Sequence, residues 1–189
     1  MKYVPNGLYL DAGCGSGNLL LYSDKDKNII GIDGSPDMLR LAAKKRADVN
    51  LFLSDLNKKL IFKDSAFNGI FSNNVIAFVD EPIFVIKEFY RVLKNGGKIC
   101  LATQKESFNL LKLIIEHIKD SKIIDTLKTL IPLLILGIMN LKMLNDAKKK
   151  KSHYFSKDIL LDLFKQAGFK NIFIESSYAD QDWLVLAEK

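Results

Sequence analysis

A glycine-rich segment that begins with an acidic residue has the composition of a ligand-binding loop. Residues 10–17 read Leu-Asp-Ala-Gly-Cys-Gly-Ser-Gly and follow a short apolar stretch. Closely spaced glycines let the backbone turn tightly and approach a ligand, because no Cβ intervenes. The carboxylate of Asp11 would repel a pyrophosphate but suits a cation, such as a zwitterionic amino acid that carries a positive sulfonium.

The spacing of this segment excludes two common phosphate-binding motifs. The dinucleotide fingerprint Gly-x-Gly-x-x-Gly needs a third glycine at position 18, where Asn18 stands. The motif Gly-x-x-x-x-Gly-Lys-Ser/Thr needs a lysine that this segment lacks. The loop therefore indicates a ligand other than a phosphate group.

Two more carboxylates follow the next two apolar segments. Asp33 comes 22 residues after Asp11, at a position where a carboxylate can accept both hydroxyl hydrogens of a ribose. Asp55 follows the third segment, where it could accept a hydrogen bond from the exocyclic amine of a purine. Ligands of open α/β sheets bind at the carboxyl ends of the strands, so the three carboxylates are expected to line one crevice.

The elements that must position these residues alternate along the first hundred residues. Helical patterns begin after Ser35, an N-cap followed by Pro36, and at residue 81, where the pattern runs to 94 and ends at Gly96 and Gly97. Short segments that are apolar on both faces are typical of strands inside a parallel sheet, and they cover residues 8–10, 28–32, 49–53, 67–71 and 98–103. This alternation predicts an α/β sheet with right-handed crossovers.

The second half of the chain departs from the alternation. Residues 107–147 are helical in period and contain no strand pattern. A helix is predicted at 157–167, capped by Ser156 and ended by Gly168, and strands are predicted at 172–174 and 183–187. We expect one domain over residues 1–189, with a helical insertion at 107–150 that serves as a substrate lid or an oligomer contact.

Composition and charge exclude several classes of protein. The 189 residues are 48% hydrophobic and 26% charged, which is typical of a globular domain. Two cysteines, Cys14 and Cys100, form no disulfide framework, and with two scattered histidines they predict no metal site; Cys100 is expected in the core. The longest uncharged stretch, residues 129–141, is shorter than the roughly 20 residues that span a membrane, and the N-terminus lacks the apolar region of a signal peptide. We therefore expect a cytoplasmic protein.

The net charge of +6 is concentrated in one place. Four consecutive lysines occupy residues 148–151, and the rest of the chain is nearly balanced. A nucleic-acid surface usually distributes its basic residues over several elements. The run is therefore interpreted as a solvated loop, and a nucleic-acid partner is not expected.

Four segments, in this order, resemble the class I S-adenosylmethionine-dependent methyltransferases of the small-molecule type. Residues 10–17 are similar to the first motif of that family, 31–39 to the second, and 88–97 to the segment entering the fifth strand, where Asn95 replaces the usual proline. The stretch from His153 to Val185 resembles the closing helix and two strands. The resemblance implies a Rossmann-like, doubly wound, mostly parallel seven-stranded sheet whose last strand is antiparallel, with S-adenosylmethionine as cofactor.

The resemblance also implies roles for individual residues. Asp11 would hold the amino group of the methionine moiety, directly or through water, Asp33 the ribose hydroxyls, and Asp55 the adenine amine. Asp55 is also compatible with a simple turn and Met38 with the core. The implied cofactor-binding residues are Asp11, Gly13, Cys14, Gly15, Gly17, Asp33, Gly34, Ser35, Met38, Asp55, Leu56 and Asn73.

Methyl transfer from a sulfonium is an in-line displacement, for which positioning and water exclusion can supply much of the acceleration. If the acceptor must lose a proton, His153, Tyr154 and His117 are candidate bases, although a packing or solvent role is favoured for all three. We expect a small, possibly apolar acceptor and a monomer or a homodimer formed through residues 107–150. The alternatives are an RNA or protein methyltransferase that docks through residues 148–151, and a non-catalytic partner subunit of the same fold.

Overall fold

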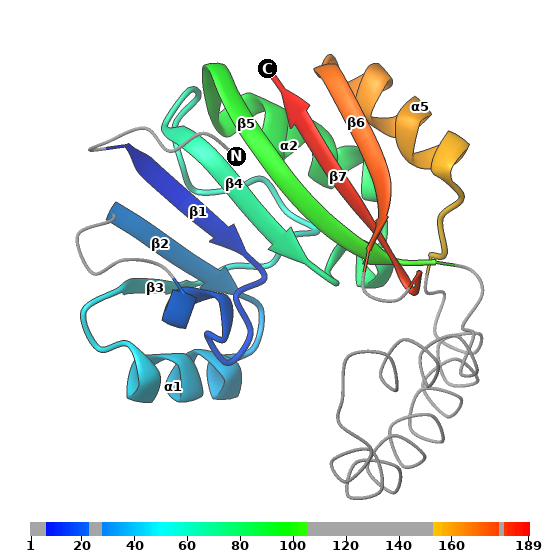
Figure 1. Ribbon diagram of the computed structural model, residues 1–189. Helices are drawn as coiled ribbons and strands as arrows, with labels where there is room; N and C mark the ends of the chain where they lie inside the picture. The colour runs from blue at the N-terminus through cyan, green and yellow to red at the C-terminus, as the bar shows by residue number, and fades with distance from the viewer. Residues whose placement is uncertain (1–6, 23–27, 106–152, 178–179) are drawn as a thin grey trace, which may run out of the picture.

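The computed structural model describes residues 7–22, 28–105, 153–177 and 180–189 (Figure 1). The predicted insertion at 107–150, His117 and the lysine run at 148–151 lie outside the described residues. Within the described ranges, none of the helices has the length and apolarity needed to cross a membrane.

A seven-stranded sheet forms the centre of the molecule, with the strand order β3-β2-β1-β4-β5-β7-β6. β1 pairs in parallel with β2 and β4, β2 with β3, and β4 with β5, whereas β7 is antiparallel to both β5 and β6. This confirms the predicted Rossmann-like sheet with an antiparallel last strand. The strands are β1 (Leu8–Ala12), β2 (Asn28–Asp33), β3 (Asn50–Leu53), β4 (Phe67–Asn73), β5 (Leu93–Gln104), β6 (Lys170–Ser177) and β7 (Asp182–Glu188).

In the described part of the chain, three α-helices and two 3₁₀ turns accompany the strands, and their ends follow from local sequence. The Ser35 and Ser156 side chains accept hydrogen bonds from the first turns of α1 and α5, and Gly168 ends α5 in the left-handed conformation. In Figure 1, α2 and α5 lie side by side behind the sheet, and α1 lies beside β3 at one end. These elements are α1 (Pro36–Lys45), α2 (Pro82–Val92), α5 (Lys157–Ala167), η1 (Leu19–Tyr22) and η2 (Ile76–Phe78).

Several element boundaries differ from the predicted ones, because pairing with a neighbouring strand extends a strand beyond its apolar segment. β1 continues through Asp11, which is paired on both sides, opposite Gly31 and Phe71. α2 ends at Val92, two residues before the predicted end, because β5 already begins at Leu93. The last two strands are longer than predicted because they pair with each other along most of their length.

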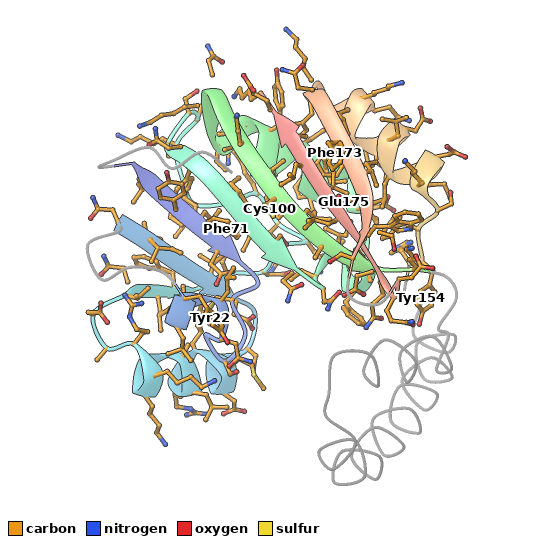
Figure 2. The ribbon with its side chains drawn as sticks, in the orientation of Figure 1. Tyr22, Phe71, Cys100, Tyr154, Phe173 and Glu175 are labelled. Atoms are coloured by element: carbon orange, nitrogen blue, oxygen red, sulfur yellow. The ribbon has the colours of Figure 1, made fainter. Side chains whose placement is uncertain are left out.

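The core lies between the sheet and the helices α2 and α5. Ile99 and Leu101 of β5 are fully buried in it, together with Phe89 of α2 and Phe164 of α5. Cys100 was expected in the core but is only half-buried, since neighbouring strand residues point to opposite faces. It points to the face turned away from α2 and α5, as Figure 2 shows.

A buried ion pair attaches the segment before β4 to α2. Glu88 accepts hydrogen bonds from the Leu60 backbone N–H at 2.8 Å and from two nitrogens of Arg91 at 2.8 and 2.7 Å. Arg91 also donates to the carbonyl oxygens of Leu60 and Phe62 and pairs with the exposed Asp64. The Arg91 guanidinium, helped by the Leu60 N–H, holds the pKa of Glu88 below its ordinary value.

We expect Glu88→Ala to lower the free energy of unfolding by about 2–4 kcal/mol, because it leaves the Arg91 guanidinium and the Leu60 N–H without their buried acceptor. Asp64→Ala is the matched control, since it removes an exposed carboxylate from the same arginine and should cost less than about 1 kcal/mol. Urea unfolding at pH 7 measures both. Because the pKa of Glu88 is lowered in the folded state, its contribution should be present above the ordinary value of 4.5 and lost as the pH falls below it. Equal losses in the two variants would contradict the assignment.

Candidate functional site

A cavity of about 460 Å³ opens at the carboxyl ends of the four neighbouring strands β1 to β4. Its volume falls within the range of about 300–1,000 Å³ that is usual for small-molecule sites. Two carboxylates, two asparagines and a group of apolar side chains share the lining. The lining residues are Gly13, Gly15, Asp33, Gly34, Asp55, Leu56, Asn73, Asn74, Val75, Phe78 and Val79.

The glycine loop after β1 depends on its glycines for two different reasons. Gly13, Gly15 and Gly17 all have positive φ angles, of 77°, 52° and 77°. A Cβ on Gly13 would lie 2.2 Å from Cγ2 of Val75, so the segment after β4 fills the space that a side chain would need. A Cβ on Gly15 would meet no atom within 4 Å, so only the positive φ angle favours glycine at this position beside the cavity.

Asp33 links the glycine loop to the start of α1. Its Oδ2 accepts a hydrogen bond from the Gly15 N–H at 2.9 Å, and its Oδ1 accepts one from the Ser35 N–H at 2.8 Å. Each carboxylate oxygen keeps a further lone pair for another donor. The side chain is therefore held in one orientation at the cavity wall while it can still accept hydrogen bonds from a ligand.

Asp11 is a buried carboxylate with unsatisfied hydrogen-bonding capacity. The residue is 2% exposed, and its Oδ2 has no partner among the described residues. Burial, followed by the negative charge of Asp33, raises the pKa of Asp11 to about 7. Such a group is costly to ionise in the absence of a cation or a hydrogen-bond donor, which is typical of a site that receives one.

The segment after β3 combines a turn with a place in the cavity wall. The Asp55 side chain accepts from the Asn57 N–H at 3.0 Å and lies 3.7 Å from the ammonium of Lys58. Both interpretations of Asp55 are thus compatible with the geometry, because the carboxylate stabilises the turn and lines the cavity. Leu56 is buried beside it.

Some of the predicted site residues do not line the cavity. Of the three carboxylates expected in one crevice, Asp33 and Asp55 line it and Asp11 does not, and Cys14, Gly17, Ser35 and Met38 are likewise absent from the lining. A Cβ on Gly17 would lie 2.9 Å from the Cβ of Ala42 in α1. Ser35 caps α1, and Met38 in its first turn is exposed rather than in the core. The thiol of Cys14 is buried, and burial, together with the charges of Asp11 and Asp33, raises its pKa to about 12. This thiol stays protonated at neutral pH, which makes it a poor nucleophile.

Four cavity residues were not predicted: Asn74, Val75, Phe78 and Val79. They follow β4 and enter the site because β4 lies next to β1 in the sheet. One signal was available, since an aromatic residue at 78 continues an apolar pattern beyond the strand. Phe78 is 52% exposed at the cavity rim.

The two described candidate bases lie behind this rim. The His153 backbone N–H donates to the Ala77 carbonyl at 2.8 Å, and its Nε2 lies 3.2 Å from the Asp80 carbonyl. Tyr154 is half-buried, and burial raises the pKa of its hydroxyl. Neither residue lines the cavity, and His153 is bonded to the turn that carries Phe78 and Val79.

We expect Gly13→Ala to lower the free energy of unfolding by about 2–4 kcal/mol, because the new methyl group collides with Val75 in a strained backbone conformation. Gly15→Ala is the control: it carries only the conformational strain and should cost about 1–2 kcal/mol. Chemical denaturation measures both. If the steric explanation holds, adding Val75→Ala restores part of the loss in the Gly13 variant and none in the Gly15 variant.

The pKa of Asp11 leads to a pH-dependent difference in stability. Unfolded Asp11 ionises near 3.8 and folded Asp11 near 7, so the folded state binds more protons between these values and becomes less stable as the pH rises through them. We expect Asp11→Asn to remove this loss, so that its stability advantage over the wild type grows from pH 4 to pH 7 and then levels off. Denaturant unfolding across this range measures it, with the exposed Asp37→Asn as control. Parallel curves for the wild type and Asp11→Asn would refute it.

The chain is similar to known proteins over half of its length or more. The family model described as "Methyltransferase domain" matches residues 10–101. The protein MJ1123 of Methanocaldococcus jannaschii is 28% identical over 172 residues, which cover 90% of this chain and 68% of that protein. Its name states no activity. A malonyl-[acyl-carrier protein] O-methyltransferase of Hamiltonella defensa is 36% identical over 95 residues, and the match spans 50% of this chain but only 36% of that enzyme.

One solved structure has the same fold over nearly the whole chain. It is a SAM-dependent methyltransferase of Thermotoga maritima, described as a possible histamine N-methyltransferase. The TM-score is 0.65 at 20% identity, and the match covers 98% of this chain and 84% of that one. At this identity the likeness concerns the fold alone.

Proposed function

Because the chain belongs to the class I S-adenosylmethionine-dependent methyltransferase family, we propose that it transfers a methyl group from S-adenosylmethionine to a small, partly apolar acceptor. In this proposal residues 1–189 act as one methyltransferase domain, and residues 107–150 serve acceptor binding or a subunit contact. The observation that carries the proposal is the meeting of Asp33, Asp55 and the glycine loop around one cavity.

The carboxylates suit three different parts of the cofactor. Asp33, already oriented by two backbone N–H groups, would accept the ribose hydroxyl hydrogens with its free lone pairs. Asp55 would accept from the adenine amine, with Leu56 against the ring. Asp11, whose Oδ2 lacks a partner among the described residues, would hold the ammonium of the methionine moiety directly or through water.

The remaining cofactor contacts are assigned to the loop backbone and to the segment after β4. Gly13, Cys14, Gly15 and Gly17 would pass beneath the methionine moiety, and the backbone of Asn73 would meet its end. Gly34, Ser35 and Met38 belong to the turn into α1, next to the proposed ribose position. Of these three only Gly34 lines the cavity, so Ser35 and Met38 would act by holding the turn in place.

When bound, the cofactor supplies an electrophilic methyl group on a sulfonium. The chain's own contribution is to place the acceptor in line with that methyl group and to exclude water, which reduces the entropic cost of the displacement. Val75, Phe78 and Val79 form an apolar wall suited to this task. The apolar wall supports an acceptor with an apolar part.

A general base is needed only for an acceptor that loses a proton as it attacks. His153 is the better placed of the two described candidates, since it is bonded to the turn that carries Phe78. A raised pKa keeps the Tyr154 hydroxyl protonated at neutral pH, where it can donate a hydrogen bond but not accept a proton.

The charge of the cavity favours a small molecule over RNA. Its lining contains two carboxylates and, among the described residues, no lysine or arginine. RNA backbones are bound through basic side chains that neutralise phosphates. The RNA and protein alternative would depend on residues 148–151, outside the described part of the chain.

We expect calorimetric titration to detect binding of S-adenosylmethionine and its demethylated product, and Asp33→Ala to weaken it by at least about tenfold, since hydrogen bonds to a charged group contribute roughly 1.5–3 kcal/mol. Asp37→Ala is the matched control: it removes an exposed carboxylate from the neighbouring first turn of α1 and should bind like the wild type. A folded wild type that binds neither compound would overturn the proposal.

Asp33 also holds the glycine loop, so a second variant separates its two roles. Asp55→Ala leaves the Gly15 and Ser35 hydrogen bonds intact, and we expect it to weaken binding of adenosine as well as of the whole cofactor. Thermal unfolding of each variant shows whether the loss reflects the ligand contact or the fold.

A further inference from the structure

The two edges of the sheet differ in how they are protected against pairing with another strand. β6 carries Lys170 and Glu175, and its pairing with β7 is irregular between Lys170 and Phe173. Charged residues and bulges on an edge strand prevent pairing with a further strand. β3, at the other edge, reads Asn-Leu-Phe-Leu, contains neither charge nor proline, and pairs with β2 in unbroken register.

β3 also exposes apolar side chains. Leu53 is 60% exposed and Phe52 41%, and α1, which packs against β3, adds Leu41 at 44%. In Figure 1, β3 is the outermost strand on its side, with α1 next to it. Apolar residues on an unprotected edge indicate a surface that is covered in the functional state.

The directions of the backbone N–H and C=O groups of β3 determine which partner can pair with its outer edge. The Ser54 N–H donates to the Asp33 carbonyl of β2 at 3.0 Å. Polar backbone groups alternate in direction along a strand, so Phe52 also faces β2, whereas the N–H and C=O groups of Leu51 and Leu53 point away from the sheet. The occupant is therefore a strand that forms hydrogen bonds with Leu51 and Leu53.

We propose that β3 pairs antiparallel with β3 of a second copy of the chain, with Phe52 opposite the partner's Phe52. In this register Leu51 lies opposite the partner's Leu53 and Leu53 opposite the partner's Leu51. Each of these two pairs exchanges both of its backbone hydrogen bonds, and the two Phe52 residues form the closer, non-hydrogen-bonded pair.

The sequence of β3 is self-complementary in this arrangement. Each of the opposed pairs is apolar, with leucines on one face and phenylalanines on the other, and cross-strand pairs of this kind stabilise sheets. The two-fold axis passes between the two Phe52 residues, so one patch serves both copies. A basic or acidic peptide strand from another protein would leave these side chains unmatched.

The size of the contact predicts a reversible dimer. Four-residue strands with one flanking helix bury less than the roughly 800 Å² per partner of a standard interface. The dimer is therefore expected to dissociate in the micromolar range or above. Because β3 ends two residues before Asp55, the pairing places the two cavities on one continuous sheet. The proposed dimer does not depend on the proposed methyl transfer.

Sedimentation velocity across about 1 µM to 1 mM tests the proposal. We expect the wild type to shift from monomer to dimer with concentration and Leu53→Lys to dimerise at least tenfold more weakly. Phe173→Lys is the matched control, because it adds the same charge at a similarly exposed position on the protected edge β6, and it should dimerise like the wild type.

Leu53→Pro tests the backbone contribution. It removes an N–H that points away from β2, so the pairing within the chain stays intact while the proposed pairing loses a donor. We expect it to reduce dimerisation as Leu53→Lys does, with circular dichroism verifying the fold; if it fails to fold, Phe52→Lys tests the central side-chain pair of the proposed contact instead. A wild type that stays monomeric throughout, or a dimer unaffected by Leu53→Lys, would overturn the proposal.

Discussion

The hydrogen bonds from Gly15 and Ser35 to the carboxylate of Asp33 are the interaction on which the site depends. They join the loop after β1 to the turn after β2, in addition to the pairing of β1 with β2 and the hydrogen bonds from the Gly13 and Cys14 N–H groups to the Ile32 carbonyl. Asp33 also lines the cavity, so the group proposed to bind the ribose is also the group that shapes the loop proposed to lie beneath the methionine moiety. Local structure and ligand recognition therefore share one side chain.

Two buried carboxylates, those of Glu88 and Asp11, differ in how far their surroundings stabilise the ionised form. Glu88 is surrounded by donors, so its pKa is lowered and it stabilises the packing of α2. Asp11 is buried with one oxygen unpartnered among the described residues, and its pKa is raised. The first arrangement is complete without a ligand. The second is costly until a cation or donor arrives, which is the expected property of a binding group.

The edge strand β3 connects the site with the surface. Its inner side completes the sheet against β2, its end leads into Asp55 and Leu56, and its outer side presents Leu51 and Leu53 to whatever pairs with it. The proposed subunit contact therefore lies two residues along the chain from the cavity wall. The protected edge β6 lies at the far end of the sheet, away from the cavity.

The sequence by itself determined the features that depend only on residues close together in the chain. Three kinds of local feature predicted the strands, the loop, and Asp33 and Asp55 of the cavity. They are the glycines at 13, 15 and 17, the carboxylates after successive apolar segments, and the caps Ser35 and Ser156. Only the tertiary structure decided which distant segment completes the wall. Val75 and Phe78 enter it because β4 pairs beside β1, whereas Ser35 and Met38, in the cap and first turn of α1, are not part of it. Strand order and helix direction arise from packing across the whole sheet, and no local pattern encodes them.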